Sequence, residues 1–319
     1  MYAAQNSIVT EKDCRTTEGI TINIQNKDDT WIKDSIVGRI ALENIQNHEK
    51  GKIICKKNNE IDEETAENIQ NTKLKEIKVR SPLTCKAKEG VCSFCYGRDL
   101  SRRKIIDIGE AVGVIASQSI SEPITQFSIG AHKKGLKKGL GSGLSQIKRL
   151  LEAYNTDEAI MSIKDTLKTK VMESIIDTAQ FLVGNIVEIF MNQGMNINRK
   201  HFEVVVREML KYVKVIDGGD TDYLPEEIIE RRIIEEVNKR LAKNKTKATF
   251  EPVLLGVKAI PSHSEGFLSA ASFERTPKVL ADAAIEGKID YLKGIQENVI
   301  LGRLIPVGTG YPKYQYKDT

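Results

Sequence analysis

The chain has 319 residues, of which 40% are hydrophobic and 29% are charged, and its formal net charge is +4 at pH 7. This composition excludes a disordered chain, and no run of ~18 uncharged apolar residues is present to form a spanning helix. The N-terminal residues also lack the basic and apolar regions of a signal peptide. The length predicts two or three packed units, and the mild positive charge allows a nucleic-acid partner without requiring one.

The first hundred residues predict short strands. Residues 1–35 alternate apolar and polar positions, as in Gly19–Ile24, which is typical of a strand. Ile53–Cys55 and Ile77–Arg80 predict two further strands, on either side of an exposed helix at residues 62–71. We therefore expect sheet structure in this part of the chain.

The residues after Asp107 predict a helix followed by a loop. The apolar residues that would share one helical face are Ile108, Val112 and Ile115. Pro123 is expected to end or kink this helix. The stretch from Gly130 to Gly143 holds five glycines and four lysines, which predicts a mobile loop. A new helix is expected to start near Ser142.

The C-terminal half predicts further helices. Residues 157–192 are helical by pattern, and the apolar residues of 202–213 recur at the i, i+3, i+4 and i+7 spacing of an amphipathic helix. Residues 225–243 predict a charged helix that opens with a proline. Near the C-terminus, Thr276 can cap a helix over residues 277–286, which also begins with a proline.

Three cysteines in a short window predict a metal site. Cys85, Cys92 and Cys95 follow the spacing C-x6-C-x2-C, and the last two have the tight-turn spacing that lets two sulfurs face one tetrahedral ion. Such cysteine usage is typical of metal binding in a reducing compartment rather than of a disulfide framework. The fourth ligand stays open between Cys14 and Cys55, because no histidine has a ligand-like spacing. The alternative is a set of buried free thiols.

A metal held in this way would have a structural role. Thiolates in all four positions of a tetrahedral zinc ion leave no position for a water molecule. The ion would therefore contribute to folding and not to chemistry.

Two segments carry a resemblance to a known family. The sequence SPLTCKAKEGVCSFCYGRDLSRRKIIDIGEAVGVIASQSISEPITQ (81–126) resembles the β′ subunit of bacterial-type multi-subunit DNA-directed RNA polymerases, from its second zinc site into its trigger helix. The opening IVTEKDCRTTEGI (8–20) resembles the β′ segment that gives the first cysteine of that zinc site. The resemblance implies that Cys14, with Cys85, Cys92 and Cys95, holds one structural Zn²⁺ per chain. It leaves Cys55 outside the site.

Further blocks of the chain resemble the same family. They are GLSQIKRLLEA (143–153), INRKHFEVVVREML (197–210), GDTDYLP (219–225) and residues 266–310. In the family, the last block belongs to the switch region at the base of the clamp and to the tail that the small ω subunit embraces. The resemblance covers roughly two thirds of the chain and identifies it as a C-terminal part of β′, so that the bridge helix would precede residue 1.

The resemblance implies a fold class and a set of domains. We expect a multi-unit, mostly helical α+β chain that is part of a larger assembly. The expected domains are a strand-rich unit with the four-cysteine zinc site (1–106), a trigger-loop helical hairpin (107–153), a helical linker and truncated jaw-side region (154–250), and a C-terminal switch, clamp-base and ω-contacting tail (251–319).

The resemblance also implies a function and partners. The chain would be one piece of a nucleotidyltransferase that synthesises RNA on a DNA template, in the cytoplasm or in a plastid stroma. Its partners would be an N-terminal β′ piece, β, α, ω and a sigma factor, with DNA, RNA and nucleoside triphosphates, and no membrane. The family's NADFDGD loop does not occur in the sequence. Mg²⁺ would therefore be bound only in the assembled enzyme, by ligands on another chain.

The resemblance further assigns residues to the trigger loop. Thr125 and Gln126 match the root of the loop, which contributes to substrate binding, and His132 matches the family's catalytic histidine if one residue is deleted before it. An imidazole beside the triphosphate could donate a proton or stabilise charge. The alternative is a solvated histidine in a lysine-rich loop.

Other positions of the trigger loop depart from the family. Ile129 stands at the methionine position and Gly130 at the arginine position, and Ser121 and Ile124 replace glycines that give the loop its freedom. These departures motivate a second hypothesis. The chain could be a catalytically inert, divergent β′ paralogue, or a zinc-containing protein that binds nucleic acid or polymerase.

Overall fold

The structure is a computed structural model that describes residues 1–24, 29–47, 53–72, 74–134, 140–152, 175–242 and 244–312. The chain is mixed α/β and forms two compact units. The cysteine unit comprises Gln5–Ile120, Asn196–Val204 and Val307–Thr319, and the helical unit comprises Met1–Ala4, Ser121–Met195 and Val205–Pro306. No helix in the described ranges has an apolar run long enough to cross a bilayer.

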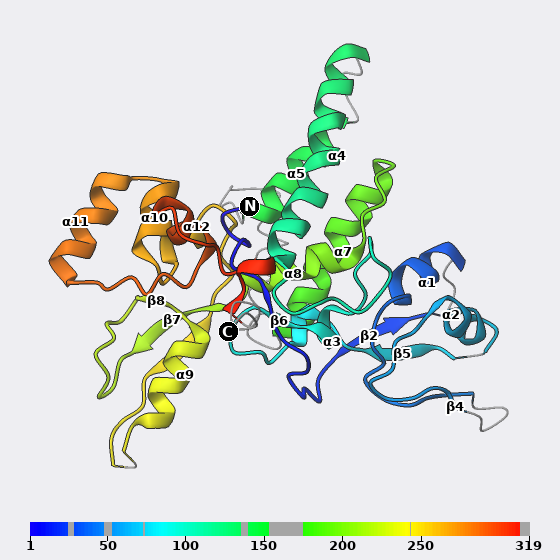
Figure 1. The fold of residues 1–319 in the computed structure, drawn as a ribbon, viewed down its shortest axis with the longest axis horizontal. Helices are drawn as coiled ribbons and strands as arrows, with labels where there is room; N and C mark the ends of the chain where they lie inside the picture. The colour runs from blue at the N-terminus through cyan, green and yellow to red at the C-terminus, as the bar shows by residue number, and fades with distance from the viewer. Residues whose placement is uncertain are drawn as a thin grey trace. The chain divides into compact units, whose positions relative to one another are not determined.

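The cysteine unit contains three small two-stranded sheets among its described residues (Figure 1). Their pairings are β1 with β6, which is parallel, and β2 with β5 and β3 with β4, which are antiparallel. The elements in chain order are β1 (Val9–Glu11), β2 (Ile20–Asn23), α1 (Asp29–Ile36), β3 (Ile45–Gln46), β4 (Ile53–Cys55), α2 (Glu63–Gln70), β5 (Glu76–Val79), η1 (Pro82–Thr84), β6 (Val91–Cys92), α3 (Ser93–Tyr96) and η3 (Gly308–Gly310).

The β2–β5 ladder forms one side of an isoleucine-rich core. Ile20 pairs with Val79 and Ile22 with Ile77, and all four side chains are buried. The alternating pattern therefore faces one apolar side inward, as predicted for these strands. The other buried members of this core include Ile36, Ile61 and Ile69.

The predicted strands of this unit are confirmed at β2, β4 and β5, and two details are wrong. Residues 29–36 form helix α1 and not strand. The helix predicted at 62–71 is α2, which Asp62 caps by accepting a hydrogen bond from the backbone N–H of Thr65 at 2.8 Å. Ala66 and Ile69 are buried in it, so α2 is a packed, amphipathic helix rather than an exposed one.

Helix α4 (Val112–Lys134) is longer than the sequence predicted. Its N-terminus lies at Val112, so Ile108 does not belong to the helical face assigned to it. Pro123 lies inside the helix and does not end it, although it cannot donate a hydrogen bond to the carbonyl of Ser119. The loop predicted from residue 130 is wrong for residues 130–134, because these belong to the helix.

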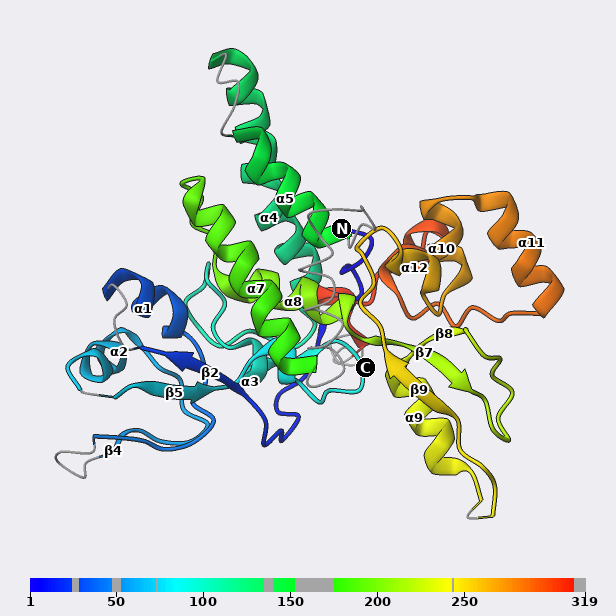
Figure 2. The same cartoon turned by 180° about the vertical axis from the view of Figure 1, so that it is seen from behind.

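Helix α5 (Leu140–Glu152) begins two residues before the predicted start at Ser142, so the predicted loop is also wrong for residues 140–143. Residues 135–139 lie outside the described part of the chain. Within the helical unit, α5 packs against α7 (Ile175–Asn192), and Figure 2 shows these two helices side by side. Helix α7 confirms the last part of the helix predicted at 157–192, and residues 157–174 lie outside the described ranges.

The rest of the helical unit combines a three-stranded antiparallel sheet, in the order β8-β7-β9, with short helices. Val213, Val215 and Ile229 from the sheet and Ile234 from α9 form its core. The elements are β7 (Tyr212–Asp217), β8 (Ile228–Glu230), α9 (Arg231–Arg240), β9 (Thr249–Pro252), η2 (Ile260–His263), α10 (Phe267–Phe273), α11 (Thr276–Glu286) and α12 (Ile295–Ile300). Helix α8 (Arg199–Met209) begins in the cysteine unit and ends in the helical unit.

Three predictions for this region are wrong in part. The amphipathic stripe of 202–213 is split, because α8 ends at Met209 and the chain continues as β7. The charged helix predicted from residue 225 is preceded by β8 and begins only at Arg231. The N-cap of α11 is Arg275 and not Thr276, whose hydroxyl instead donates to the carbonyl of Ala271 at 2.6 Å.

Candidate metal centre

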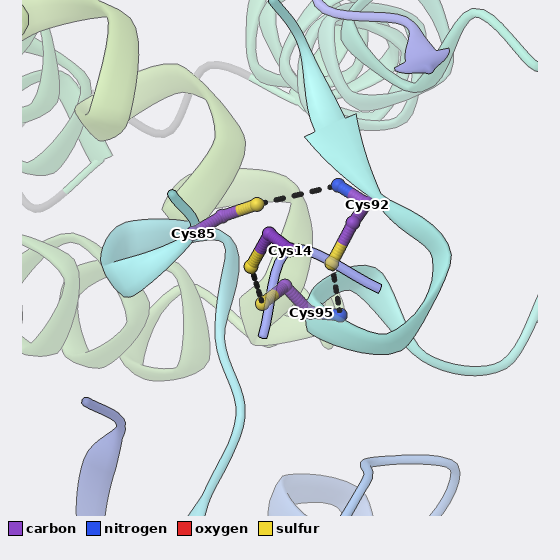
Figure 3. Close-up of side chains that lie close together, drawn as sticks. All are labelled: Cys14, Cys85, Cys92 and Cys95. Carbon is purple, nitrogen blue, oxygen red and sulfur yellow. Dashed lines mark hydrogen bonds between the residues drawn. The ribbon is translucent and has the colours of Figure 1, made fainter. Parts of the chain in front are cut away.

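Four cysteines from separate parts of the cysteine unit converge on one point (Figure 3). Cys14 lies in the loop after β1, and Cys85 directly follows η1. Cys92 ends β6 and caps the short helix α3, which carries Cys95. The parallel pairing of β1 with β6 brings the N-terminal segment beside the C-x2-C turn.

The four sulfurs lie close enough together to share one metal ion. All of them lie within 4.8 Å of one another, and Cys14 Sγ is 3.6 Å from Cys95 Sγ. A zinc ion with Zn–S bonds of ~2.3 Å separates its ligand sulfurs by about 3.8 Å. The donor set and its spacing are therefore compatible with a Zn²⁺ ion.

Backbone N–H groups point at three of these sulfurs. Cys92 N–H donates to Cys85 Sγ at 3.3 Å, Cys95 N–H donates to Cys92 Sγ at 3.3 Å, and Lys86 N–H donates to Cys14 Sγ at 3.4 Å. Such donors stabilise negative charge on sulfur. The turns around the cysteines are therefore shaped for thiolates and not only for packing.

Two glycines next to the cysteines permit this close approach. Gly90 and Gly97 both have positive φ, at 57° and 82°. A Cβ at Gly90 would collide with the carbonyl of Ile8, and one at Gly97 with the carbonyl of Gly38. Only glycine therefore lets the C-x2-C turn lie against the neighbouring backbone.

Arg80 is a component of the cluster that the sequence patterns did not single out. Its side chain is 1% exposed, and its Nη2 atom lies 3.5 Å from Cys14 Sγ, 3.8 Å from Cys92 Sγ and 3.6 Å from Cys95 Sγ. The same nitrogen donates to Asp13 Oδ1 at 2.6 Å. An arginine at the end of a strand gives no local signal of this role, because Cys14 and Asp13 come from a distant segment.

The thiols of the cluster influence one another's ionisation. Hydrogen bonds from Cys85, then Cys92 and Cys95, lower the pKa of Cys14 far below its usual value. The contact with Cys14 raises the pKa of Cys92, but contacts with Cys85 and Cys95 outweigh it and the net pKa falls to about 7. Contacts with Cys14, Cys85 and Cys92, together with burial, raise the pKa of Cys95. A metal ion is bound by thiolates, so its binding to such a cluster would release protons.

Cys55 does not join the cluster. It lies in β4, where its Sγ is 3.6 Å from the carbonyl oxygen of Lys56 and 3.8 Å from that of Glu60. Burial, followed by the charge of Asp62, raises the pKa of this thiol. Cys55 therefore behaves as a protonated core residue.

The residues predicted for the trigger loop lie in helix α4. Thr125 is exposed, and its hydroxyl donates to the carbonyl of Ser121 at 3.0 Å. Gln126 and His132 fall within the bounds of α4, but their side chains lie outside the described part of the chain. Their predicted roles remain predictions.

Comparison with known proteins identifies the family. Residues 1–173, more than half of the chain, match the family described as RNA polymerase Rpb1, domain 5. The β′ subunit of DNA-directed RNA polymerase from Thermoanaerobacter sp. (strain X514) is 37% identical over 98% of this chain. The β′ subunits of Moorella thermoacetica and Oceanobacillus iheyensis are 35% and 34% identical, again over 98% of the chain.

The chain spans 31 to 32% of the length of these three relatives. The alignment with the Thermoanaerobacter protein is 377 positions long, which exceeds the 319 residues of the chain. That relative therefore carries, within the aligned region, residues that this chain lacks. The predicted resemblance to the C-terminal part of β′ is confirmed, and the chain belongs to the family of RNA polymerase Rpb1, domain 5.

Proposed function

We propose that the chain is a C-terminal β′ piece of a DNA-directed RNA polymerase and takes part in template-directed RNA synthesis. The observation that carries this proposal is the similarity of nearly the whole chain to β′ subunits. The proposed partners are an N-terminal β′ piece, β, α, ω and a sigma factor, together with DNA, RNA and nucleoside triphosphates. The proposed location is the cytoplasm or a plastid stroma.

The cysteine cluster is proposed to hold one structural Zn²⁺, with Cys14, Cys85, Cys92 and Cys95 as its ligands. The sulfur spacing and the backbone donors support this assignment. Zinc bound by four thiolates ties the segment after β1 to the C-x2-C turn. Mg²⁺ would be held elsewhere in the assembled enzyme, since the chain has no NADFDGD sequence.

We also propose a role for each region of the chain. Residues 1–106 would form the zinc-bearing unit, 107–153 the trigger-loop hairpin, 154–250 a linker and trimmed jaw-side region, and 251–319 the clamp base and ω-contacting tail. The extra aligned positions of the relative support a trimmed region in this chain. Within the trigger loop, His132 is the proposed catalytic residue, and Thr125 and Gln126 would contact substrate.

The C-terminal part of the helical unit supports the role of a subunit. Residues 285–305, named here the C-terminal apolar surface, leave large apolar side chains in solvent: Ile285 is 84% exposed, Ile289 70% and Leu304 76%. Further exposed members of this C-terminal apolar surface are Tyr291, Val299, Ile300 and Leu301. A concentration of exposed apolar side chains marks a contact with another protein, which fits the clamp base and the ω tail.

The second candidate is a catalytically inert β′ paralogue, or a zinc-containing protein that binds nucleic acid or polymerase subunits. The residues that favour it are Ile129 and Gly130, which replace the methionine and arginine of the family's trigger loop. Such a protein would keep the zinc site and the interfaces but would not accelerate nucleotide addition.

An affinity pull-down of the tagged chain from its native cells separates these candidates. The eluate would be identified by mass spectrometry and assayed for primer extension on a DNA template. Recovery of β, ω and an N-terminal β′ piece with RNA synthesis supports the polymerase subunit. Recovery of the same partners without synthesis supports the inert paralogue, and recovery of nucleic acid alone, in a salt-sensitive manner, supports the binding protein.

A further inference from the structure

The buried guanidinium of Arg80 is a positive charge next to the cysteine sulfurs. A divalent zinc ion with four thiolate ligands carries a net charge of about −2. A net charge inside a protein is unfavourable unless an opposite charge lies close by. Arg80 is the cation in contact with three of the four sulfurs.

The surroundings of Arg80 fix its head group in this position. Its Nη1 donates to Asn58 Oδ1 at 3.2 Å, and its guanidinium carbon lies 5.5 Å from the centre of the Phe94 ring. Asp13 holds Nη2 from the more exposed side, with 28% of its side chain accessible. The planar head group is thus clamped between a carboxylate, an amide, an aromatic ring and the sulfurs.

The need of the Arg80 guanidinium for hydrogen-bond acceptors does not by itself explain why it lies beside the sulfurs. The Nε–H of Arg80 is buried and has no hydrogen-bond partner among the described residues. The observed orientation instead directs Nη2 at the sulfurs.

We propose that Arg80 is a positioning residue for the metal centre, which balances the charge of the cysteine sulfurs and sets how tightly they hold the metal. This inference rests on the proposed zinc site and adds a residue to it. The hydrogen bonds from Arg80 withdraw electron density from the sulfurs, while its charge stabilises the set of thiolates that the metal needs.

The test compares the full-length chain with Arg80→Met and Arg80→Lys. Zinc affinity is measured by competition with a chromophoric chelator at pH 7, and Co²⁺ is substituted for zinc to record the sulfur-to-cobalt charge-transfer band. Arg80→Met is expected to weaken zinc binding roughly 10–100-fold, as is usual for partners of metal ligands. Its charge-transfer band is expected at longer wavelength, because sulfurs without the donor hold their electrons less tightly.

Arg80→Lys keeps the charge but loses the planar fork, so its affinity and band position should lie between those of wild type and Arg80→Met. Arg98→Met is the matched control: Arg98 is 11% exposed and pairs with Glu60 and Glu63 in the same unit, without an observed cysteine contact. We expect it to leave the band unchanged.

Three results would overturn the inference. A wild-type chain that binds neither Zn²⁺ nor Co²⁺ removes the metal centre and Arg80's role together. Metal binding by wild type, with the same band position and affinity in Arg80→Met as in wild type, removes only the role of Arg80. A loss of affinity in Arg80→Met with no change in its band would show that the arginine acts only through packing.

Discussion

Cys92 and Cys55 are both buried thiols, yet only Cys92 lies beside other sulfurs. We predict that Cys92→Ser loses about one zinc per chain and destabilises residues 81–100, because the ligand set is broken. Cys55→Ser is the matched control and should retain the metal. Metal content by plasma mass spectrometry, with circular dichroism on the same samples, checks this. Equal zinc loss from both variants would contradict the ligand assignment.

Glu203 illustrates a second kind of buried charge in the cysteine unit. It is fully buried and accepts hydrogen bonds from Arg39 at 2.6 and 3.0 Å and from Ser81 at 2.7 Å. Burial alone would raise the pKa of this carboxyl group, but the charge and hydrogen bonds of Arg39 outweigh it and lower the pKa to about 2. The ionised form is therefore preferred in the folded state.

The sign of this shift predicts acid sensitivity. The pKa of an unfolded glutamate is about 4.3, so the stabilisation is present above that pH and is lost as the pH falls toward 2. We predict that Glu203→Gln lowers the free energy of unfolding at pH 7 by roughly 3–5 kcal/mol, because it leaves Arg39 buried without a counter-charge. Urea unfolding at pH 7 and pH 3 should show a smaller pH dependence in the variant than in wild type.

The control for this measurement is Glu67→Gln. Glu67 pairs with Lys33 at 2.8 Å, but its side chain is 60% exposed. A surface pair of this kind contributes about 0–1 kcal/mol, so the variant should unfold like wild type. A wild-type unfolding free energy that does not change between pH 7 and pH 3 would refute the assigned role of Glu203.

At the scale of the elements, helix α4 lacks one backbone hydrogen bond at Pro123, which has no N–H to donate. We predict that Pro123→Ala slows amide hydrogen exchange in α4, because the alanine N–H restores the missing backbone bond. Glu122→Ala changes an exposed neighbour without altering the backbone bonds and should leave exchange nearly unchanged. Faster exchange in Pro123→Ala would show that the proline is needed for the native path of the helix.

Elements whose structure is set by their own sequence were predictable, whereas elements that depend on pairing with distant segments were not. Strand β2 followed from the alternation of apolar and polar residues in its own sequence, which the structure shows as alternating buried and exposed positions. The apolar spacing of 202–213 could not reveal where α8 ends, because β7 owes its structure to pairing with β8 and β9. A short apolar run fits both the helical and the strand period, and only its partner strands decide between the two.

The same limit applied to the candidate metal centre. The spacing of Cys85, Cys92 and Cys95 predicted a site, but spacing could not choose between Cys14 and Cys55, and only the resemblance did so. Arg80 escaped notice because two of its contacts, with Asp13 and Cys14, come from a segment 66 or 67 positions away. Ligands and supporting residues that meet through tertiary pairing leave no local pattern.

At the scale of the whole molecule, the C-terminal apolar surface has a testable role. We predict that Ile285→Glu combined with Leu304→Glu reduces recovery of β and ω in the pull-down at least ten-fold, because two charges would be buried in the contact. Leu224→Glu is the control, since Leu224 is 70% exposed and lies outside this surface. Equal recovery with the double variant and the control would assign the contact to another surface.

The separation of Cys14 from Cys95 by 81 positions has a consequence for biosynthesis. At 5–20 residues per second, Cys14 is made roughly 4 to 16 s before Cys95. During that interval the ribosome has delivered β2, β5 and the isoleucine core between them, but not a complete ligand set. The isoleucine core can therefore begin to assemble before the four cysteines are all present, whereas the proposed metal ion can bind its full ligand set only after Cys95 has been made.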